Sequence, residues 1–322
     1  MTTWNQTAIT FADSSTIGNE PRGIHIDINN TIYVANYQNG TVRISFSNGS
    51  NITKSISRSS SQAYMVFSSS NGDIYVSSQR SSSYYIDKFT LNDTNSTLVG
   101  SPSGTCYGLF VDINDILYCS MRDSDQVVKK PLDDGLDVWT NVAGSAGHPG
   151  PGPTKLWNPC RIFVDDNLDL YVADSGNNRI QLFHLGISTG ITVAGSWFPY
   201  TGIKLNRPTG VILDADKYLF IVDQGNNRIV GSGPNGFRCI VGCSGSSGST
   251  ANKLSSPSTM AFDSFGNIFV TDIDNNRVQK FTIFTNSCSK FINSYNVLKE
   301  KERFLGILTD PQRIKSVIHI YL

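Results

Sequence analysis

Short apolar runs alternate with clusters of Asn, Asp and Gly along most of the chain, and residues 159 to 184 give the clearest example. Runs of four to six β-branched and aromatic residues bounded by such clusters are typical of strands and tight turns. This stretch predicts three short strands, at 161–165, 168–173 and 179–183. A small isolated sheet is only marginally stable in water, so the stretch requires further copies of itself.

Copies of this unit recur at a regular interval. Pro159, Pro208 and Pro257 open three closely matching units with a period of 49 residues. Looser copies begin near Pro21 and before Asp112. An aromatic residue marks the second strand of every unit: Tyr33, Tyr75, Tyr118, Tyr171, Phe220 and Phe269. Repeats of this length are typical of solenoids, arrays or propellers.

The second copy, over residues 66–85, is the weakest of the six. It keeps the aromatic residue Tyr75, but Ser68 occupies the position where the other units have an aspartate at the end of the first strand. We therefore expect a blade here that lacks the carboxylate of its neighbours.

The shared residues resemble the NHL repeat, which forms one blade of a β-propeller. The matching pattern is Pro, a small residue, an apolar run to Asp, an aromatic-Val pair, Ala-Asp and Asn-Asn-Arg-Ile. The resemblance covers roughly residues 1 to 285 and is most specific in the last three units. It implies a six-bladed β-propeller of four-stranded antiparallel blades, because six units are counted and family members commonly close with six. We assign residues 1–289 to the propeller and 290–322 to a C-terminal tail.

Residues 3–12 predict a strand that has no unit of its own. They resemble the fourth strands expected at 138–144 and 191–195, whereas the sixth unit becomes polar at 284–289 where its own fourth strand should lie. An open ring would expose an unpaired strand edge, whereas a propeller protects its edges. We therefore expect residues 3–12 to complete the sixth blade and close the ring.

The tail differs from the repeats in composition. Its apolar positions between Val297 and Leu308 predict an amphipathic helix that ends before Pro311. Docking on the propeller, contact with another chain and an error in the gene model are all compatible with this segment.

The charges are balanced, with 26 Lys and Arg against 26 Asp and Glu, so the chain has no global field that attracts nucleic acid or an acidic membrane. No apolar stretch approaches the roughly 18 residues of a membrane helix. The first residues have neither the basic head nor the apolar core of a signal peptide. An extracellular location is nevertheless favoured by six cysteines and by seven Asn-x-Ser/Thr triplets, which mark glycan acceptors in secreted chains. The triplets begin at Asn5, Asn29, Asn39, Asn48, Asn51, Asn92 and Asn95.

The six cysteines are an even number, which is compatible with disulfides outside the cell. Cys106 and Cys160 occupy nearly equivalent positions in neighbouring units and are a possible bridge, whereas Cys119 is expected to be a buried thiol. Cys239 and Cys243 have no second Cys or His pair nearby to complete a zinc site. Packing thiols are the favoured interpretation.

Two sets of repeated charged residues are interpreted as structural. Asp side chains commonly accept hydrogen bonds from the backbone two residues on, and a bidentate Arg–carboxylate pair would lock a tight turn. A ring of carboxylates that binds a cation is the alternative, but a binding site requires asymmetry that a repeat does not supply. The first set ends each first strand: Asp27, Asp112, Asp165, Asp214 and Asp263. The second set pairs residues five positions apart: Asp174 with Arg179, Asp223 with Arg228, and Asp272 with Arg277.

Catalytic chemistry has little support in the sequence. Peptidyl-hydroxyglycine lyases, which have similar propellers, need several zinc-binding histidines on inner strands, and here only His25 lies on a first strand. Lactonase-like propellers use a Glu ligand, and Glu20 is the only glutamate before residue 300. No Gly-x-Ser-x-Gly elbow is present. We expect no catalytic residue, metal or cofactor, and keep a metal-dependent enzyme of one of these two types as the alternative.

The loops between blades carry the residues that favour binding. Loops on a rigid scaffold concentrate binding residues, and aromatic residues dominate interface hot spots. The predicted face consists of His148, Lys155, Trp157, Trp197, Phe198, Tyr200, Lys204 and Lys253. We expect a non-catalytic scaffold for a protein, peptide or glycan. The same aromatics could instead fill gaps between blades. RNA binding, known for similar NHL propellers, is a third option that three lysines and a neutral total support poorly.

Overall fold

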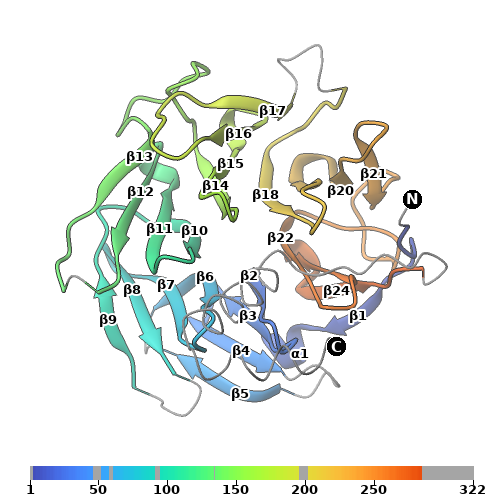
Figure 1. Cartoon of the computed structure of the whole chain (residues 1–322). Helices are drawn as coiled ribbons and strands as arrows, with labels where there is room; N and C mark the ends of the chain where they lie inside the picture. Colours follow the sequence, from blue (N-terminus) through green and yellow to red (C-terminus); the bar gives the residue numbers. More distant parts are fainter. Residues whose placement is uncertain are drawn as a thin grey trace, which may run out of the picture.

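The computed structural model describes residues 3–45, 52–57, 61–90, 95–133, 135–195 and 202–284. Over these ranges the chain forms six four-stranded antiparallel sheets arranged in a ring (Figure 1). The predicted six-bladed propeller is therefore confirmed. The predicted helical tail, residues 290–322, lies outside the described residues. No helix in the described ranges is long and apolar enough to cross a membrane.

Blades 1 to 5 run in chain order from a first strand at the axis to a fourth strand at the rim, and the outer strand of blade 6 is supplied by β1 (Ile9–Ala12). Blade 1 contains β2 (Pro21–Ile26), β3 (Ile32–Asn36), β4 (Thr41–Ser45) and β5 (Ile52–Ser57). Blade 2 contains β6 (Gln62–Ser68), β7 (Ile74–Arg80), β8 (Ser83–Phe89) and β9 (Thr97–Gly100). Blade 3 contains β10 (Cys106–Val111), β11 (Ile116–Met121), β12 (Gln126–Pro131) and β13 (Thr140–Gly144).

Blades 4 to 6 follow the same order. Blade 4 contains β14 (Pro159–Val164), β15 (Leu170–Asp174), β16 (Arg179–Phe183) and β17 (Ile191–Gly195). Blade 5 contains β18 (Pro208–Leu213), β19 (Leu219–Asp223), β20 (Arg228–Gly231) and β21 (Arg238–Val241). Blade 6 contains β22 (Pro257–Phe262), β23 (Ile268–Asp272), β24 (Arg277–Phe281) and β1 (Ile9–Ala12). A four-residue helix, α1 (Ser14–Ile17), links β1 to blade 1.

The amino-terminal segment closes the ring, as expected. β1 pairs antiparallel with β24 (Figure 1). In this pair, Thr10 lies opposite Gln279. Ahead of β1, Trp4 is only 3% exposed. Its indole donates to the Gly266 carbonyl at 2.8 Å and packs edge-on against Phe220, with ring centroids 5.5 Å apart. Trp4 and Ala8 are therefore part of the core between blades 5 and 6.

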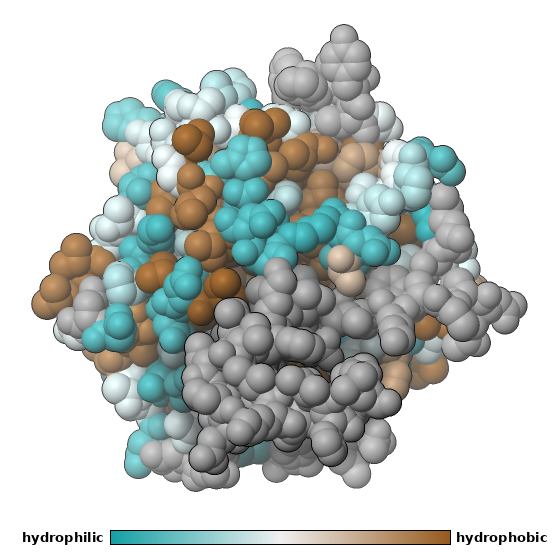
Figure 2. Space-filling model, viewed as in Figure 1, coloured by the Kyte–Doolittle hydropathy of each residue, from teal (hydrophilic) through white to brown (hydrophobic). Residues whose placement is uncertain are grey.

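The hydrophobic core is divided into six clusters, one at each interface between neighbouring blades. Leu156, Leu205 and Leu254, each preceded by a lysine, are buried in three of these clusters. Figure 2, in the same view as Figure 1, shows hydrophobic residues in small groups between hydrophilic ones over the blades of β10 to β17. The side chains that hold the ring together therefore lie between blades.

The second blade departs from its sequence prediction by one residue. Ser69 N donates to Asp73 O at 2.9 Å, as Asp27 N donates to Thr31 O at 3.0 Å in blade 1. The place of the carboxylate is therefore taken by Ser69, and the assignment to Ser68 is wrong. The register agrees, because Tyr75 lies opposite Phe67 as Tyr33 lies opposite His25. Ser68 is instead the last residue of β6.

Candidate functional site

The strand directions define two faces of the ring. Each first strand begins where the loop from the previous blade arrives, and the 3-10 turns between second and third strands lie at the same end, since Gly176 N donates to Trp157 O at 2.8 Å. We call this end the loop face, marked by Trp157, Asn206 and Ser255. The opposite end, where first strands finish at their aspartates, is the turn face.

On the turn face, the repeated aspartates bind their own backbone. Asp27 Oδ1 accepts from Asn29 N and Thr31 N, both at 2.8 Å, and its Oδ2 accepts from the Tyr33 hydroxyl at 3.0 Å. The same pair of backbone bonds occurs at Asp112, Asp165, Asp214 and Asp263. Over the described ranges, there is no group of three or more His, Cys, Asp or Glu side chains that could hold a metal ion.

On the loop face, the second set of aspartates ties three pieces of chain together. Asp174 Oδ2 accepts from Arg179 Nε at 2.7 Å, and its Oδ1 accepts from Trp157 N at 2.7 Å. The other guanidinium nitrogens of Arg179 donate to loop carbonyls, including those of Pro151 and Lys155. The expected bidentate pair is therefore wrong, because the loop takes the remaining donors. The same Nε contact joins Asp223 to Arg228 and Asp272 to Arg277.

Trp157 is the aromatic residue that this arrangement displays. Its side chain is 48% exposed, while its backbone is held by Asp174 and Gly176. A Cβ at position 176 would lie 2.6 Å from Trp157 Cγ, so the indole rests against a position that requires glycine. The Trp157 indole is therefore not buried between blades, but it packs against the backbone at Gly176.

The other residues of the predicted binding face differ in their exposure to solvent, and some of them lie outside the described residues. His148, Lys155 and Lys204 are exposed, whereas Lys253 is half-buried, with its aliphatic stem near Gly248. Trp197, Phe198 and Tyr200 lie outside the described residues.

The loops also leave the loop face, contrary to expectation. Pro153 O accepts from Gly190 N, and Ala251 O from Ala8 N, both at 2.8 Å. Gly190 and Ala8 precede the fourth strands of their blades, at the turn-face end. Each loop therefore passes down beside the next blade before it returns to the loop face.

The axis of the ring contains a channel that the sequence patterns did not reveal. One residue of each first strand lines it at the same level: His25, Phe67, Phe110, Phe163, Ile212 and Ala261. Four of these residues, from His25 to Phe163, have rings that pack in succession in tilted or edge-on contacts, with centroids 4.6 to 5.4 Å apart. They border a cavity of about 110 Å³. Burial here lowers the pKa of His25 to about 4, although the nearby Asp27 carboxylate opposes this shift. The only signal in the sequence was the residue two positions before each first-strand aspartate, which is apolar in every unit that has the aspartate except the first, where it is His25.

Nearer the loop face, the channel ends in a group of cationic and phenolic side chains, which we call the arginine–tyrosine cluster. Its members are Arg22, Tyr37, Tyr64, Tyr107, Arg122 and Arg161. The Arg22 guanidinium lies 3.5 Å from the ring centroid of Tyr37, and that of Arg122 lies 5.0 Å from that of Tyr107. Tyr64 stands between the two other tyrosines, at 5.1 and 5.0 Å. Arginine on aromatic faces is a stabilising arrangement that fixes the guanidinium plane.

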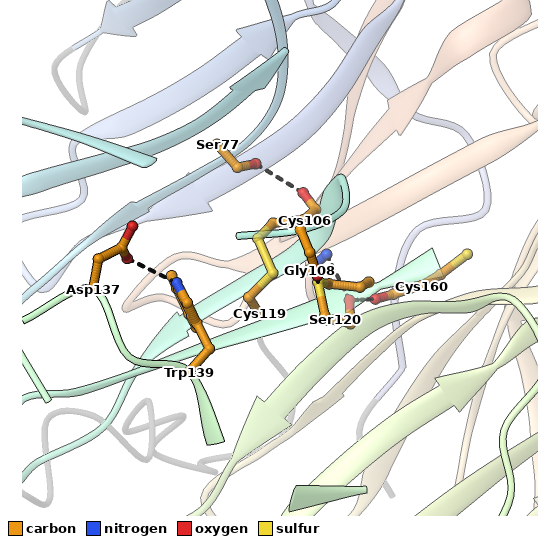
Figure 3. Close-up of a disulfide and its surroundings, with 10 residues drawn as sticks. Ser77, Cys106, Gly108, Cys119, Ser120, Asp137, Trp139 and Cys160 are labelled. Atoms are coloured by element: carbon orange, nitrogen blue, oxygen red, sulfur yellow. Dashed lines mark hydrogen bonds between the residues drawn. A yellow bond between two sulfur atoms is a disulfide. The ribbon is translucent and has the colours of Figure 1, made fainter. Parts of the chain in front are cut away.

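The cysteines pair differently from the predictions. Cys106 and Cys119 form a disulfide between adjacent strands of blade 3, and Cys239 bonds to Cys243 (Figure 3 shows the first). The bridge from Cys106 to Cys160 is therefore wrong, and so is a free thiol at Cys119. Cys160 remains a free buried thiol because its side chain faces the core between blades 4 and 5, whereas Cys106 and Cys119 face the core between blades 2 and 3.

With this geometry described, comparison with known proteins identifies the repeat. Residues 156–183, which include most of blade 4, match the family model described as NHL repeat. The chain is a six-bladed β-propeller with an NHL repeat in its fourth blade. No curated protein sequence matches this NHL propeller.

Solved structures share the fold of this NHL propeller at low sequence identity. A protein of unknown function from Bacteroides thetaiotaomicron superposes with a TM-score of 0.70 at 13% identity, covering 86% of this chain and 76% of that one. An auxiliary nutrient binding protein from Bacteroides ovatus gives 0.65 at 17%, covering 87% and 73%. A catalytically inactive virginiamycin B lyase from Staphylococcus aureus, with quinupristin, gives 0.61 at 13%, covering 88% and 99%. These identities show a common fold.

Proposed function

We propose that this NHL propeller is a non-catalytic binding module whose loop face receives a protein, peptide or glycan partner. The observation that carries the proposal is Trp157, an aromatic side chain that is half-exposed on a backbone held by Asp174 and Gly176. Binding energy at interfaces concentrates in such aromatic anchors. A rigid anchor also loses little conformational freedom when a partner binds.

The surroundings of Trp157 support a binding surface made of mixed groups. His148 and Lys155, on the same loop, are exposed and add polar contacts. The loop is fixed by the bonds of Arg179 to its carbonyls, so these groups are presented in a defined arrangement. A propeller from Bacteroides ovatus with the same fold is described as nutrient-binding, which is compatible with a binding role.

Peptide and glycan arrays probed with the purified chain test this proposal. Trp157→Ala should weaken binding to the array ligands about tenfold or more, because loss of an aromatic anchor costs about 2 kcal/mol. Phe265→Ala is the matched control. Phe265 is 69% exposed in the turn between β22 and β23, on the turn face, and its loss should leave binding unchanged.

Both variants should melt within a few degrees of the parent chain, because both side chains are substantially exposed. Equal binding by the parent chain and Trp157→Ala would refute the proposal. Loss of folding in Trp157→Ala would instead assign the indole to packing.

A further inference from the structure

The arginine–tyrosine cluster holds a buried cation that lacks a counter-charge. Arg161 is only 5% exposed, and its Nη2 crosses the axis to the carbonyls of Arg22 and Tyr64, in blades 1 and 2. Among the described residues, its Nη1 is buried without a hydrogen-bond partner, and so is Nε of Arg22. Most buried polar groups are hydrogen-bonded, so two unpaired donors in one cluster require an explanation.

The other buried arginines show what is missing. Arg179, which is buried, and Arg277, which is partly buried, each contact an aspartate at 2.7 Å, whereas Arg161 has no carboxylate partner among the described residues. The nearby Glu20 is engaged by Arg22 at 3.2 Å. Burial lowers the pKa of Arg161 to about 10, and the Arg22 cation adds to this effect. Arg161 therefore remains charged at neutral pH, and a buried unpaired charge is costly unless an anion joins it.

The cavity beside Arg161 sets the shape of that anion. It is lined mainly by apolar side chains, among them Met65, Phe110, Phe163 and Met260. Its volume of about 110 Å³ is smaller than the roughly 150 Å³ that admits a benzene ring in other proteins. An apolar group of this size that enters the cavity is therefore a short aliphatic chain. Inorganic phosphate has no such group.

We propose that the arginine–tyrosine cluster and the cavity form a binding site for a small carboxylic acid with a short aliphatic body. The carboxylate accepts from Arg161 Nη1 and from Arg22, since a guanidinium matches the geometry of a carboxylate. The aliphatic body enters the channel among the phenylalanines. This site lies at the axis and goes beyond the loop-face function, so each proposal can fail without the other.

Isothermal titration calorimetry of the full chain with sodium pentanoate tests the site. Pentanoate should bind saturably to the parent protein, and Arg161→Met should weaken it about tenfold or more, because hydrogen bonds to charged groups are the strong ones. Arg161→Lys keeps the charge but not the planar donors, and should also weaken binding. Arg43→Met is the matched control: it removes an arginine from β4, away from the axis, and should bind as the parent does.

Four further measurements make the result decisive. n-Pentanol and inorganic phosphate should both bind more weakly than pentanoate. n-Pentanol lacks the carboxylate, and inorganic phosphate lacks the aliphatic chain. Trp157→Ala should bind pentanoate as the parent does, which separates this site from the loop face. Without ligand, Arg161→Met should melt at or above the parent temperature, because the variant no longer buries an unpaired charge.

The proposal is overturned if pentanoate fails to bind the parent chain at millimolar concentration. It is overturned as well if n-pentanol or inorganic phosphate binds equally well, or if Arg161→Lys and Arg161→Met both bind pentanoate like the parent. A ligand-free Arg161→Met that melts well below the parent would assign Arg161 to holding blades 1, 2 and 4 together.

Discussion

At the residue scale, the repeated aspartates have the structural role that the repeat predicts. The sequence did not specify which atoms they contact. Asp174 joins the end of β15, the arginine of β16 and the backbone of Trp157 with its two oxygens. Asp27 and its four counterparts satisfy backbone donors of their own turns. In blades 4 to 6, two kinds of aspartate therefore mark the two faces of the blade, and these carboxylates are already engaged by hydrogen bonds.

The side chain of His25 gives a prediction at the same scale. Its pKa lies near 4 in the folded chain and near the usual 6.5 when unfolded, so between these values the unfolded state binds more protons. The stability that neutral His25 contributes is therefore fully present above pH 6.5 and is lost as the pH falls to 4. At 1.36 kcal/mol per pH unit, this loss amounts to about 3 kcal/mol.

His25→Phe tests this contribution, because phenylalanine occupies the equivalent position in blades 2, 3 and 4. Urea unfolding at pH 7 and pH 4 should show that the variant loses about 3 kcal/mol less between these conditions than the parent does. Carboxylates titrate in both proteins, so only the difference counts. Equal losses would show that His25 is not buried in neutral form.

At the scale of elements, the amino-terminal segment is the piece that makes the sixth blade complete. Trp4 reaches from this segment to Gly266 and Phe220, and β1 supplies the outer strand that β24 would otherwise lack. An exposed edge strand invites association with other chains. We therefore expect residues 3–12 to affect both the stability and the solubility of the ring.

Deletion of residues 1–12 should lower solubility and broaden thermal unfolding, as followed by circular dichroism and sedimentation. Trp4→Ala alone should cost about 3 to 5 kcal/mol, because a buried tryptophan is replaced by a cavity. Trp157→Ala is the control, with a much smaller cost expected for its exposed ring. A truncated chain that melts like the parent would contradict the closure described here.

The structural features that could be predicted from the sequence are those marked by repeated residues. Six aromatic positions and five aspartates placed the blades, and the missing fourth strand of the last unit located the role of β1. Contacts that occur once were not predictable. Arg161 meets the carbonyl of Arg22 from 139 positions away, and no repeat encodes that contact. The Cys106–Cys119 bridge depends on which side of the sheet each sulfur faces, and the shift from Ser68 to Ser69 depends on the register of β6.

At the scale of the whole molecule, closure of the ring positions both proposed sites. The loop face exists because every first strand begins at the same end, and the channel exists because six first strands surround one axis. Arg161 of blade 4 contacts blades 1 and 2 only in a closed arrangement. An open array would separate these partners, and both the channel and its cation would be lost.

The most direct test of closure is a disulfide between Thr10→Cys and Gln279→Cys. These residues lie opposite each other, and their side chains meet, with Thr10 Oγ1 3.0 Å from Gln279 Oε1. Peptide mapping of the oxidised chain should find the two introduced cysteines joined. The pair Thr10→Cys with Lys280→Cys, one residue out of register, should remain unjoined because neighbouring side chains on a strand face opposite sides. Absence of the first bond, or equal formation of both, would contradict the closed propeller.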